Sequence, residues 1–221
     1  MSVPLIRFEH VTLAVRSQRL LSDVSFSLAS GEKAVVRGRS GAGKSTLLKT
    51  LLGLHRPTAG RILYQGRPLD PATTRLLRTH AAYIGQEPVL GAETVREALL
   101  LPFRFKAHRG RTPTEAQLVA TLAGLGLPAA LLDHPAGRVS GGEKQRIALA
   151  RALLLGKSLY LLDEITSALD AESKQAVLAL LLDPTITVLS VAHDPEWIAR
   201  CTKVYDLDQG RLARETQLGD G

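Results

Sequence analysis

The stretch KAVVRGRSGAGKS, residues 33–45, decides the fold of this chain. Its first five residues form a short, largely apolar run that favours a buried strand. The next eight match the spacing G-x-x-x-x-G-K-[ST] at every fixed position and open a predicted helix over residues 45–54. Glycines let the backbone approach a phosphate closely, and N–H groups at the start of a helix face its negative charge. The stretch therefore predicts a phosphate-binding loop made of Gly38, Arg39, Ser40, Gly41, Ala42, Gly43, Lys44, Ser45 and, in the first turn of the helix, Thr46.

Two side chains of this loop carry chemistry. We expect Lys44 to supply positive charge to the outer phosphates of a nucleotide and Ser45 to offer its hydroxyl to Mg²⁺. A glycine-rich turn that caps a helix by chance would not explain the strand, the lysine and the serine together.

Strands and helices alternate along most of the chain. Alternating or apolar runs predict strands over 5–15, 24–28, 61–64, 81–84, 159–162 and 186–192, and a helix over 171–182. This alternation predicts an α/β fold with a mostly parallel sheet. The stretch from about 94 to 155 is rich in predicted helix and interrupts the pattern, so we interpret it as an inserted subdomain.

Two carboxylates, Asp163 and Glu164, follow the apolar strand predicted over 159–162. In open α/β sheets, ligands gather beyond the carboxyl ends of the strands. We expect Asp163 to hold Mg²⁺ and Glu164 to orient and polarise an attacking water, a role worth about 10²–10⁴ in rate. Taken alone, the pair could equally start a loop and cap the next helix.

A second glycine-rich segment, VSGGEKQR over 139–146, precedes a strongly predicted helix. Ser140 and Glu143 have the S-x-x-E spacing of a capping box. Gly141 and Gly142 would in addition bare the N–H groups of a positive helix end, which is a second anion site. We expect that site to serve another nucleotide.

With these motifs in this order, nearly the whole chain resembles the ATP-binding subunit of ATP-binding cassette (ABC) transporters. Ser140, Gly141 and Gly142 match the family's signature motif, although Val139 and Glu143 stand where Leu and Gln are more usual. The resemblance implies a P-loop NTPase (RecA-like) core, an N-terminal antiparallel β-subdomain and an inserted helical signature subdomain over about 92–155, within one domain spanning 1–221. It also implies ATP and Mg²⁺ as ligands, and a head-to-tail dimer in which each signature reaches the partner's γ-phosphate.

Single residues extend the resemblance. Gln86 is similar to the family's Q-loop glutamine, which touches Mg²⁺ or water and senses the membrane subunit, and His193 to the switch histidine, which contacts the γ-phosphate. The stretch SALD over 167–170 is similar to the D-loop, which lines the dimer interface. Alone, these residues could be a polar loop residue, a surface histidine and a capped helix start. The resemblance implies catalytic roles for Glu164, His193, Gln86 and Lys44, and a metal site of Ser45, Gln86 and Asp163.

One position departs from the family. An aromatic residue that stacks on adenine is usual near the end of the first strand, where this chain has Val15 and Arg16. Arg16 could stack on the base as a cation, or Val15 could give a weaker apolar contact.

The net positive charge of the chain is compatible with several classes of partner, including a membrane surface and nucleic acid. Lys and Arg number 28 and Asp and Glu 21, a formal net charge of +7, and no apolar run is long enough to cross a bilayer. The clearest basic cluster is Arg104, Lys106, His108, Arg109 and Arg111, which could be a solvated surface or lie near a membrane. Aromatic residues make up only 4% of the chain, which disfavours nucleic acid as a partner. The single cysteine, Cys201, excludes an internal disulfide and suits a reducing compartment.

These observations predict an ATP-hydrolysing subunit that powers transport through a separate transmembrane permease, with a second copy of itself and no nucleic acid as partner. The expected location is the cytoplasmic face of the inner or plasma membrane, and residues 87–91 with the helix from Thr94 are the expected docking surface. The stretch DEITSALD over 163–170 is similar to that of small bacterial ATPases assigned to iron or metal export. Lipoprotein release and amino-acid uptake remain alternatives, as does a soluble cassette ATPase that acts on nucleic acid or ribosomes.

Overall fold

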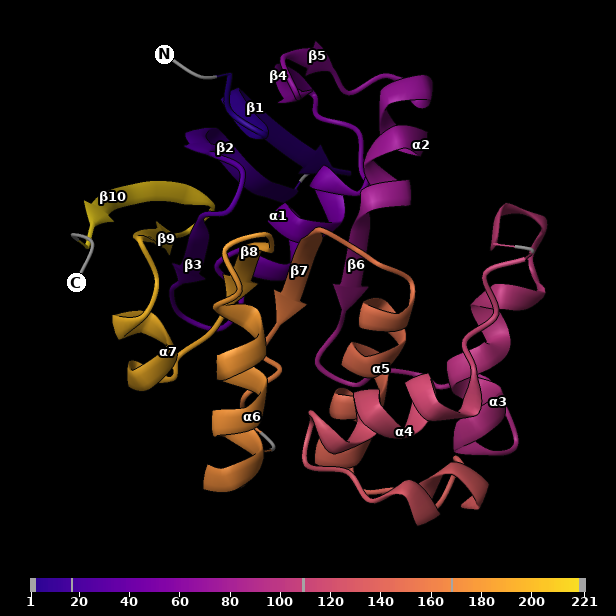
Figure 1. Ribbon diagram of the computed structural model, residues 1–221. Coiled ribbons are helices and arrows are strands. Elements are labelled where there is room, and N and C mark those ends of the chain that lie inside the picture. Colours follow the sequence, from indigo (N-terminus) through magenta and orange to yellow (C-terminus); the bar gives the residue numbers. More distant parts are fainter. Residues whose placement is uncertain (1–2, 17, 109, 168, 219–221) are drawn as a thin grey trace. The chain divides into compact units, whose positions relative to one another are not determined.

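The computed structural model describes residues 3–16, 18–108, 110–167 and 169–218 (Figure 1). The chain divides into two compact units, the first comprising residues 1–83, 158–164 and 182–221 and the second residues 84–157 and 165–181. A single domain with a helical insertion at about 92–155 stays a prediction. Among the described residues, no helix has both the length and the hydropathy of a membrane span.

A four-stranded antiparallel sheet begins the first unit. Its strands lie in the order β2 (Gln18–Leu28), β1 (Ile6–Val15), β4 (Ala59–Tyr64) and β5 (Arg67–Pro68). Buried and more exposed residues largely alternate along β1 and β2, and the rings of Phe8 and Phe26 stack across the pair with centroids 4.5 Å apart. The strand predicted over 24–28 is the second half of β2, which begins at Gln18 because the whole segment pairs with β1.

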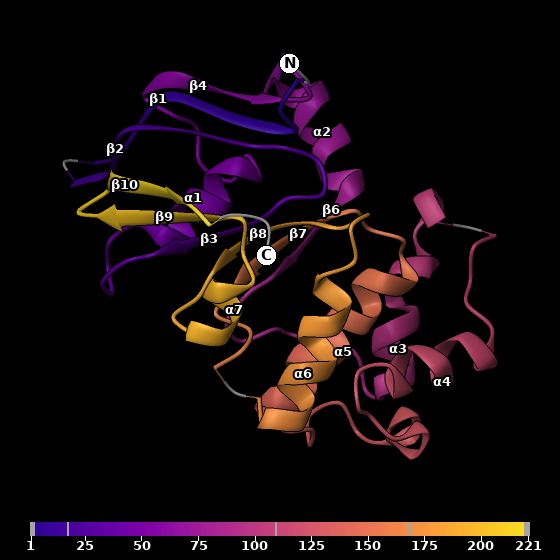
Figure 2. The same cartoon turned by 60° about the vertical axis from the view of Figure 1, so that its left-hand side comes forward.

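A six-stranded sheet forms the rest of the core of this unit. Its order is β10 (Arg211–Gln217), β9 (Lys203–Asp208), β3 (Lys33–Arg37), β8 (Thr187–Val191), β7 (Leu159–Asp163) and β6 (Ala81–Ile84), whose last residue belongs to the second unit. Strands β9, β3, β8 and β7 are parallel, and only β10 is antiparallel to its neighbour β9 among the pairs described (Figure 2). The carboxyl ends of β3, β7 and β8 therefore share one edge, where the candidate residues follow.

The described residues of the first unit form three helices. Helix α1 (Lys44–Leu51) buries Leu47, Leu48 and Leu51 in the core, and it ends before the predicted Leu54 because Gly53 adopts a φ of +70°. Helix α2 (Pro71–His80) begins with the capping residue Asp70, and the short helix α7 (Pro195–Ala199) begins with Asp194.

In the second unit, the described elements other than the last residue of β6 are helices and 3₁₀ turns joined by loops. It contains α3 (Val95–Leu100), the 3₁₀ turns η1 (Leu101–Arg104) and η2 (Lys106–His108), α4 (Glu115–Ala123), η3 (Ala129–Asp133), α5 (Gly141–Leu154) and α6 (Ala171–Leu181). Helices α3 and α4 pack on α5. In the basic cluster, Arg104, Lys106 and Arg111 are exposed and His108 is half-buried, whereas Arg109 lies outside the described residues.

Candidate active site

The loop between β3 and α1 has the backbone that phosphate binding needs. Gly43 precedes α1 with a φ of +99° and has no side chain, and no side-chain cap hydrogen bond is formed at this end of the helix among the described residues. Gly38 is packed so tightly that a Cβ atom there would lie 2.0 Å from the carbonyl oxygen of Leu207. A side chain at Gly38 would therefore push the loop away from β9.

Lys44 is folded over this loop. Its side chain is buried, and its Nζ donates hydrogen bonds to the carbonyl oxygens of Gly38 and Arg39 at 2.8 and 3.1 Å. The ammonium group thus lies among the backbone groups of the loop, where its positive charge adds to that of the helix N-terminus.

Ser45 and Asp163 meet although they are far apart in the sequence. The Ser45 hydroxyl, in the first turn of α1, donates to Oδ1 of Asp163 at 3.0 Å, and Asp163 ends the buried strand β7. The hydroxyl of Tyr83 on β6 donates to the other oxygen, Oδ2, at 3.2 Å. Burial, and then the charge of Asp163, raise the pKa of Tyr83 to about 12, so this tyrosine stays a donor at neutral pH.

Tyr83 is a site residue that the sequence analysis did not single out. It lies in the strand predicted over 81–84, and its only signal is a polar tip at the end of an otherwise apolar run. A phenol this far from Asp163 in the sequence can be assigned only once the sheet order is known.

Glu164 and His193 follow the carboxyl ends of β7 and β8. Glu164 has a φ of +56°, and its N–H group donates to the carbonyl oxygen of Val191 at 2.9 Å. Non-glycine residues in the left-handed region are uncommon and cluster at functional sites. Nε2 of His193 lies 3.9 Å from Oε1 of Glu164, and the side chains are 58% and 28% exposed, so both remain open to a ligand.

The segment at Ser140 forms the predicted capping box in the second unit. The Ser140 hydroxyl accepts from the N–H group of Glu143 at 3.3 Å, and the Glu143 carboxylate accepts from the N–H group of Ser140 at 2.7 Å. The second of these hydrogen bonds lowers the pKa of Glu143. Among the described residues, no atom outside the chain neighbours and the backbone of α5 lies within 4 Å of the place where a Cβ of Gly141 would be, so the N-terminus of α5 is open there.

Gln86 is also in the second unit, in the exposed loop after β6. Its carbonyl oxygen accepts from Nε2 of Gln145 at 3.1 Å, and the Gln145 side chain is buried in α5. In the stretch 167–170, Ala168 lies outside the described residues, while Asp170 caps α6 by accepting from the N–H group of Ser173 at 2.8 Å.

The structure thus gathers part of the predicted site in the first unit. Asp163 ends β7, and Lys44, Ser45, Glu164 and His193 come after the carboxyl ends of β3, β7 and β8 at one edge of the sheet. Gln86 and the segment Ser140–Gly142 belong to the second unit. At the end of β1, Val15 is 43% exposed and Arg16 has a φ of +55°.

The fold and this loop define the chain as a P-loop nucleoside triphosphatase. The sequence pattern of one family, described as ABC transporter, matches residues 21–167. The chain belongs to the ABC transporter family and is an ATP-binding, ATP-hydrolysing subunit. The predicted family, fold class and activity are therefore confirmed.

Relatives and solved structures agree with this assignment. The chain is 36% identical over 208 residues to the "Probable iron export ATP-binding protein FetA" of Escherichia coli (strain K12), covering 92% of this chain and 91% of FetA. It is 37% identical over 203 residues to the "Methionine import ATP-binding protein MetN" of Cutibacterium acnes (strain DSM 16379 / KPA171202), covering 86% of this chain but only 55% of MetN. The ATP-binding cassette MJ0796, solved as a dimer in a post-hydrolysis state bound to ADP and Pi, superposes with a TM-score of 0.86 at 27% identity, covering 98% of this chain and all of that one.

Proposed function

We propose that two copies of this chain bind ATP between them and that hydrolysis drives a separate membrane-spanning permease. The hydrogen bond between Ser45 and Asp163 carries this proposal, since it joins the phosphate loop to the acidic strand end in one unit. The first half of the cycle is ATP binding, in which Gly38–Thr46 wrap the phosphates and Lys44 neutralises their charge.

We infer that Mg²⁺ accompanies the nucleotide. The donors available are a hydroxyl and a carboxylate, which are the hard oxygen ligands that Mg²⁺ prefers, and Gln86 is the proposed third ligand. The described residues contain no cluster of three or more His, Cys, Asp or Glu side chains that could hold a metal ion. Few protein ligands are what Mg²⁺ needs when phosphates supply the others. When bound, Mg²⁺ offsets negative charge on the phosphates.

Hydrolysis is assigned to Glu164 and His193. Glu164 accepts a proton from the attacking water and aligns it, while His193 contacts the γ-phosphate. Their separation of 3.9 Å supports a shared task, because both side chains then face the same small volume. When phosphates bind, a change in the contacts of Gln86 shifts the adjoining loop at residues 87–91, which contacts the permease.

The signature segment completes the site of the opposite copy. Ser140, Gly141 and Gly142 present the open N-terminus of α5, which suits the γ-phosphate of a nucleotide bound by the partner. The dimeric state of MJ0796 supports this pairing. Adenine is held near Val15 and Arg16, with the guanidinium of Arg16 stacked on the base.

The permease docks on the second unit, and the chain lies at the cytoplasmic face of the membrane. A cavity of about 720 Å³ is lined by residues 86–92 together with Ala136, Gly137, Ser167 and residues of α5, and Val89 in this lining is 82% exposed. For the cargo we propose iron or another metal leaving the cell, supported by the match to FetA over 91% of its length.

Two measurements test this function. The Glu164→Gln variant with ATP and Mg²⁺ should have twice the monomer mass by light scattering, and adding Ser140→Arg should return it to the monomer. The native protein purified from membranes should carry a multi-span membrane protein. A monomer under all nucleotide conditions would refute the pairing, and RNA or DNA in place of a membrane protein would favour the soluble alternative.

The cargo has a separate test. Deleting the gene should raise the iron content of cells grown with excess iron. A plasmid carrying the wild-type gene should return the iron content to its original level, whereas one carrying Glu164→Gln should not. Unchanged metal content would reject metal export while leaving the ATPase assignment intact.

A further inference from the structure

Both oxygens of the Asp163 carboxylate accept hydrogen bonds from hydroxyl groups of the first unit. Ser45, at the start of α1, donates to Oδ1 at 3.0 Å, and Tyr83, on β6, donates to Oδ2 at 3.2 Å. Asp163 is buried, whereas Tyr83 is half-buried. The carboxylate is therefore fixed between two donors that come from different elements.

The two donors differ in their relation to the proposed metal ion. Ser45 is itself a proposed ligand of Mg²⁺, so its hydroxyl has two tasks. Tyr83 is outside the proposed set of ligands, and its hydroxyl occupies the carboxylate oxygen that Ser45 does not contact. An aspartate carboxylate turns readily about its last bond, because that torsion has broad minima. A donor at each oxygen restricts this rotation more than a single donor does.

The position of Tyr83 depends on elements outside the nucleotide site. Strand β6 begins directly after α2 and is the neighbour of β7 in the six-stranded sheet. Arg78 on α2 donates through Nε and Nη2 to the carbonyl oxygen of Leu52, at 2.9 and 2.7 Å, which joins α2 to the end of α1. Ser45 is at the other end of α1. The elements that carry the two donors are thus connected to each other.

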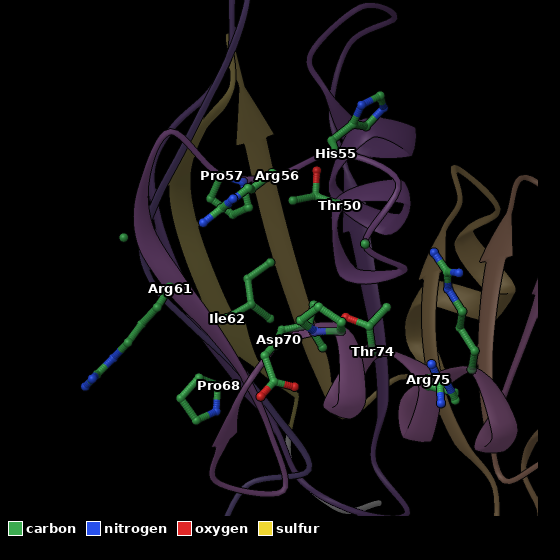
Figure 3. Close-up of a pocket in the computed structure, with 15 residues that line it drawn as sticks. Thr50, His55, Arg56, Pro57, Arg61, Ile62, Pro68, Asp70, Thr74 and Arg75 are labelled. Carbon is green, nitrogen blue, oxygen red and sulfur yellow. The ribbon is translucent and has the colours of Figure 1, made fainter.

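Helix α2 also borders a cavity of about 810 Å³, together with the end of α1, the connection to β4 and the β4–β5 hairpin (Figure 3). None of the three residues at the carboxylate lines this cavity. Arg56 and Arg75 lie on opposite sides of it in Figure 3, and Asp70 is the one carboxylate among its described lining residues. Because like charges repel, the cavity is unfavourable for a divalent cation. It therefore does not compete with Asp163 for a metal ion.

We propose that Tyr83 is a positioning residue for Mg²⁺, whose hydroxyl holds Asp163 in the orientation in which Oδ1 faces Ser45. This inference rests on the proposed function, because it takes Ser45 and Asp163 as metal ligands. Mg²⁺ demands near-ideal octahedral geometry, so a carboxylate that is already oriented binds it more readily. Removing a hydrogen-bond partner of a metal ligand typically costs about 10–100-fold in metal affinity. Tyr83 acts through Asp163 and needs no contact with the ion.

The test removes one phenol hydroxyl at a time. Tyr83→Phe deletes the donor to Oδ2 and keeps the ring, which packs against the core. Tyr64→Phe is the matched control, because the Tyr64 hydroxyl lies 2.7 Å from Nδ1 of His80, in a hydrogen bond of the same unit that does not involve Asp163. Asp163→Asn shows the effect of losing a proposed ligand. Each protein, in excess over ADP, is titrated with Mn²⁺ in place of Mg²⁺, and the bound ion is measured by electron paramagnetic resonance alongside ADP alone.

The expected result is a selective loss of metal affinity. The ADP complex of Tyr83→Phe should bind Mn²⁺ about 10-fold more weakly than that of wild type, whereas Tyr64→Phe should match wild type. Calorimetry without metal should give the same ADP affinity for all three proteins, which verifies that they are folded. In hydrolysis assays, the Mg²⁺ concentration for half-maximal turnover should rise by a similar factor in Tyr83→Phe, and saturating Mg²⁺ should restore kcat.

The variants distinguish a failure of this inference from a failure of the proposed metal site. Unchanged Mn²⁺ affinity in Tyr83→Phe, together with a loss in Asp163→Asn, would overturn the inference and leave the metal site intact. Equal losses in Tyr83→Phe and Tyr64→Phe would also overturn it, because the effect would then come from general destabilisation. Wild type that binds Mn²⁺ no better than ADP alone, or full affinity in Asp163→Asn, would reject the proposed metal ligands and the role of Tyr83 with them.

Discussion

Replacing Glu164 by Gln removes the proposed base while leaving its surroundings in place. Gln has nearly the same shape, and the backbone hydrogen bond from residue 164 to Val191 does not involve the side chain. The amide cannot accept a proton from water. Loss of general-base assistance costs about 10²–10⁴ in rate, which corresponds to roughly 3–5 kcal/mol in the activation barrier.

The position of Glu164 predicts which quantity changes. Its carboxylate lies next to His193 at the sheet edge, whereas phosphate binding is assigned to the loop at Gly38–Ser45. We therefore expect kcat to fall at least ~100-fold, with the ATP affinity and the free energy of unfolding close to those of wild type. Phosphate release with ATP and Mg²⁺ gives kcat, and calorimetry gives the affinity.

A matched control separates this effect from a general loss of negative charge. Glu172 lies in the first turn of α6 and is exposed, so Glu172→Gln should retain wild-type turnover. Turnover of Glu164→Gln within a few-fold of wild type, at unchanged ATP affinity, would show that another group activates the water.

Three further predictions concern the same unit. Lys44→Ala should weaken ATP binding about 10–100-fold by calorimetry, since a charge-assisted hydrogen bond is worth about 1.5–3 kcal/mol; normal affinity would reject the phosphate loop. Gly38→Ala places a Cβ 2.0 Å from a carbonyl oxygen of β9 and should lower the free energy of unfolding, measured in urea, by about 3 kcal/mol. The Cβ of Gly41→Ala would meet no described neighbour within 4 Å, so this variant should lose only about 1 kcal/mol. Equal losses in the two variants would contradict this packing. The hydrogen bond from Arg37 lowers the pKa of Asp206 below 3.8, so this pair should stabilise the protein above about pH 4 and stop doing so as the pH falls through the lowered pKa. Arg37→Gln should therefore reduce the drop in the free energy of unfolding between neutral and acid pH. An unchanged drop would disprove the contribution of the pair.

The sequence predicted the structure correctly where a single short segment contained both the pattern of a strand or helix and residues with a chemical role. The strand predicted over 33–37 matches β3, and the capping box at Ser140 forms as predicted. Both follow from short-range rules, because strand length, glycine spacing and helix caps depend on neighbouring residues. The roles assigned to Gln86 and to the signature segment stay predictions.

Other elements carried weaker local signals. Helix α2 and strands β9 and β10 were not predicted: α2 contains three threonines and three basic residues, and β10 is mostly charged and polar, with Leu212 as its one large apolar residue. Their structure depends on packing against the sheet, which no short window of sequence contains. Tyr83 was missed for the same reason, since its contact with Asp163 joins two strands that are far apart in the sequence.

The side-chain amide of Gln145 connects helix α5 to the loop at Gln86 through a hydrogen bond to the Gln86 carbonyl oxygen. This hydrogen bond is partly buried, because the Gln145 side chain is buried while Gln86 is exposed. We expect a displacement of the Gln86 loop by a neighbouring protein to reach Ser140, which lies less than two turns of α5 away from Gln145. The buried amide of Gln145 would then connect the surface that meets a neighbouring protein with the predicted signature segment at Ser140.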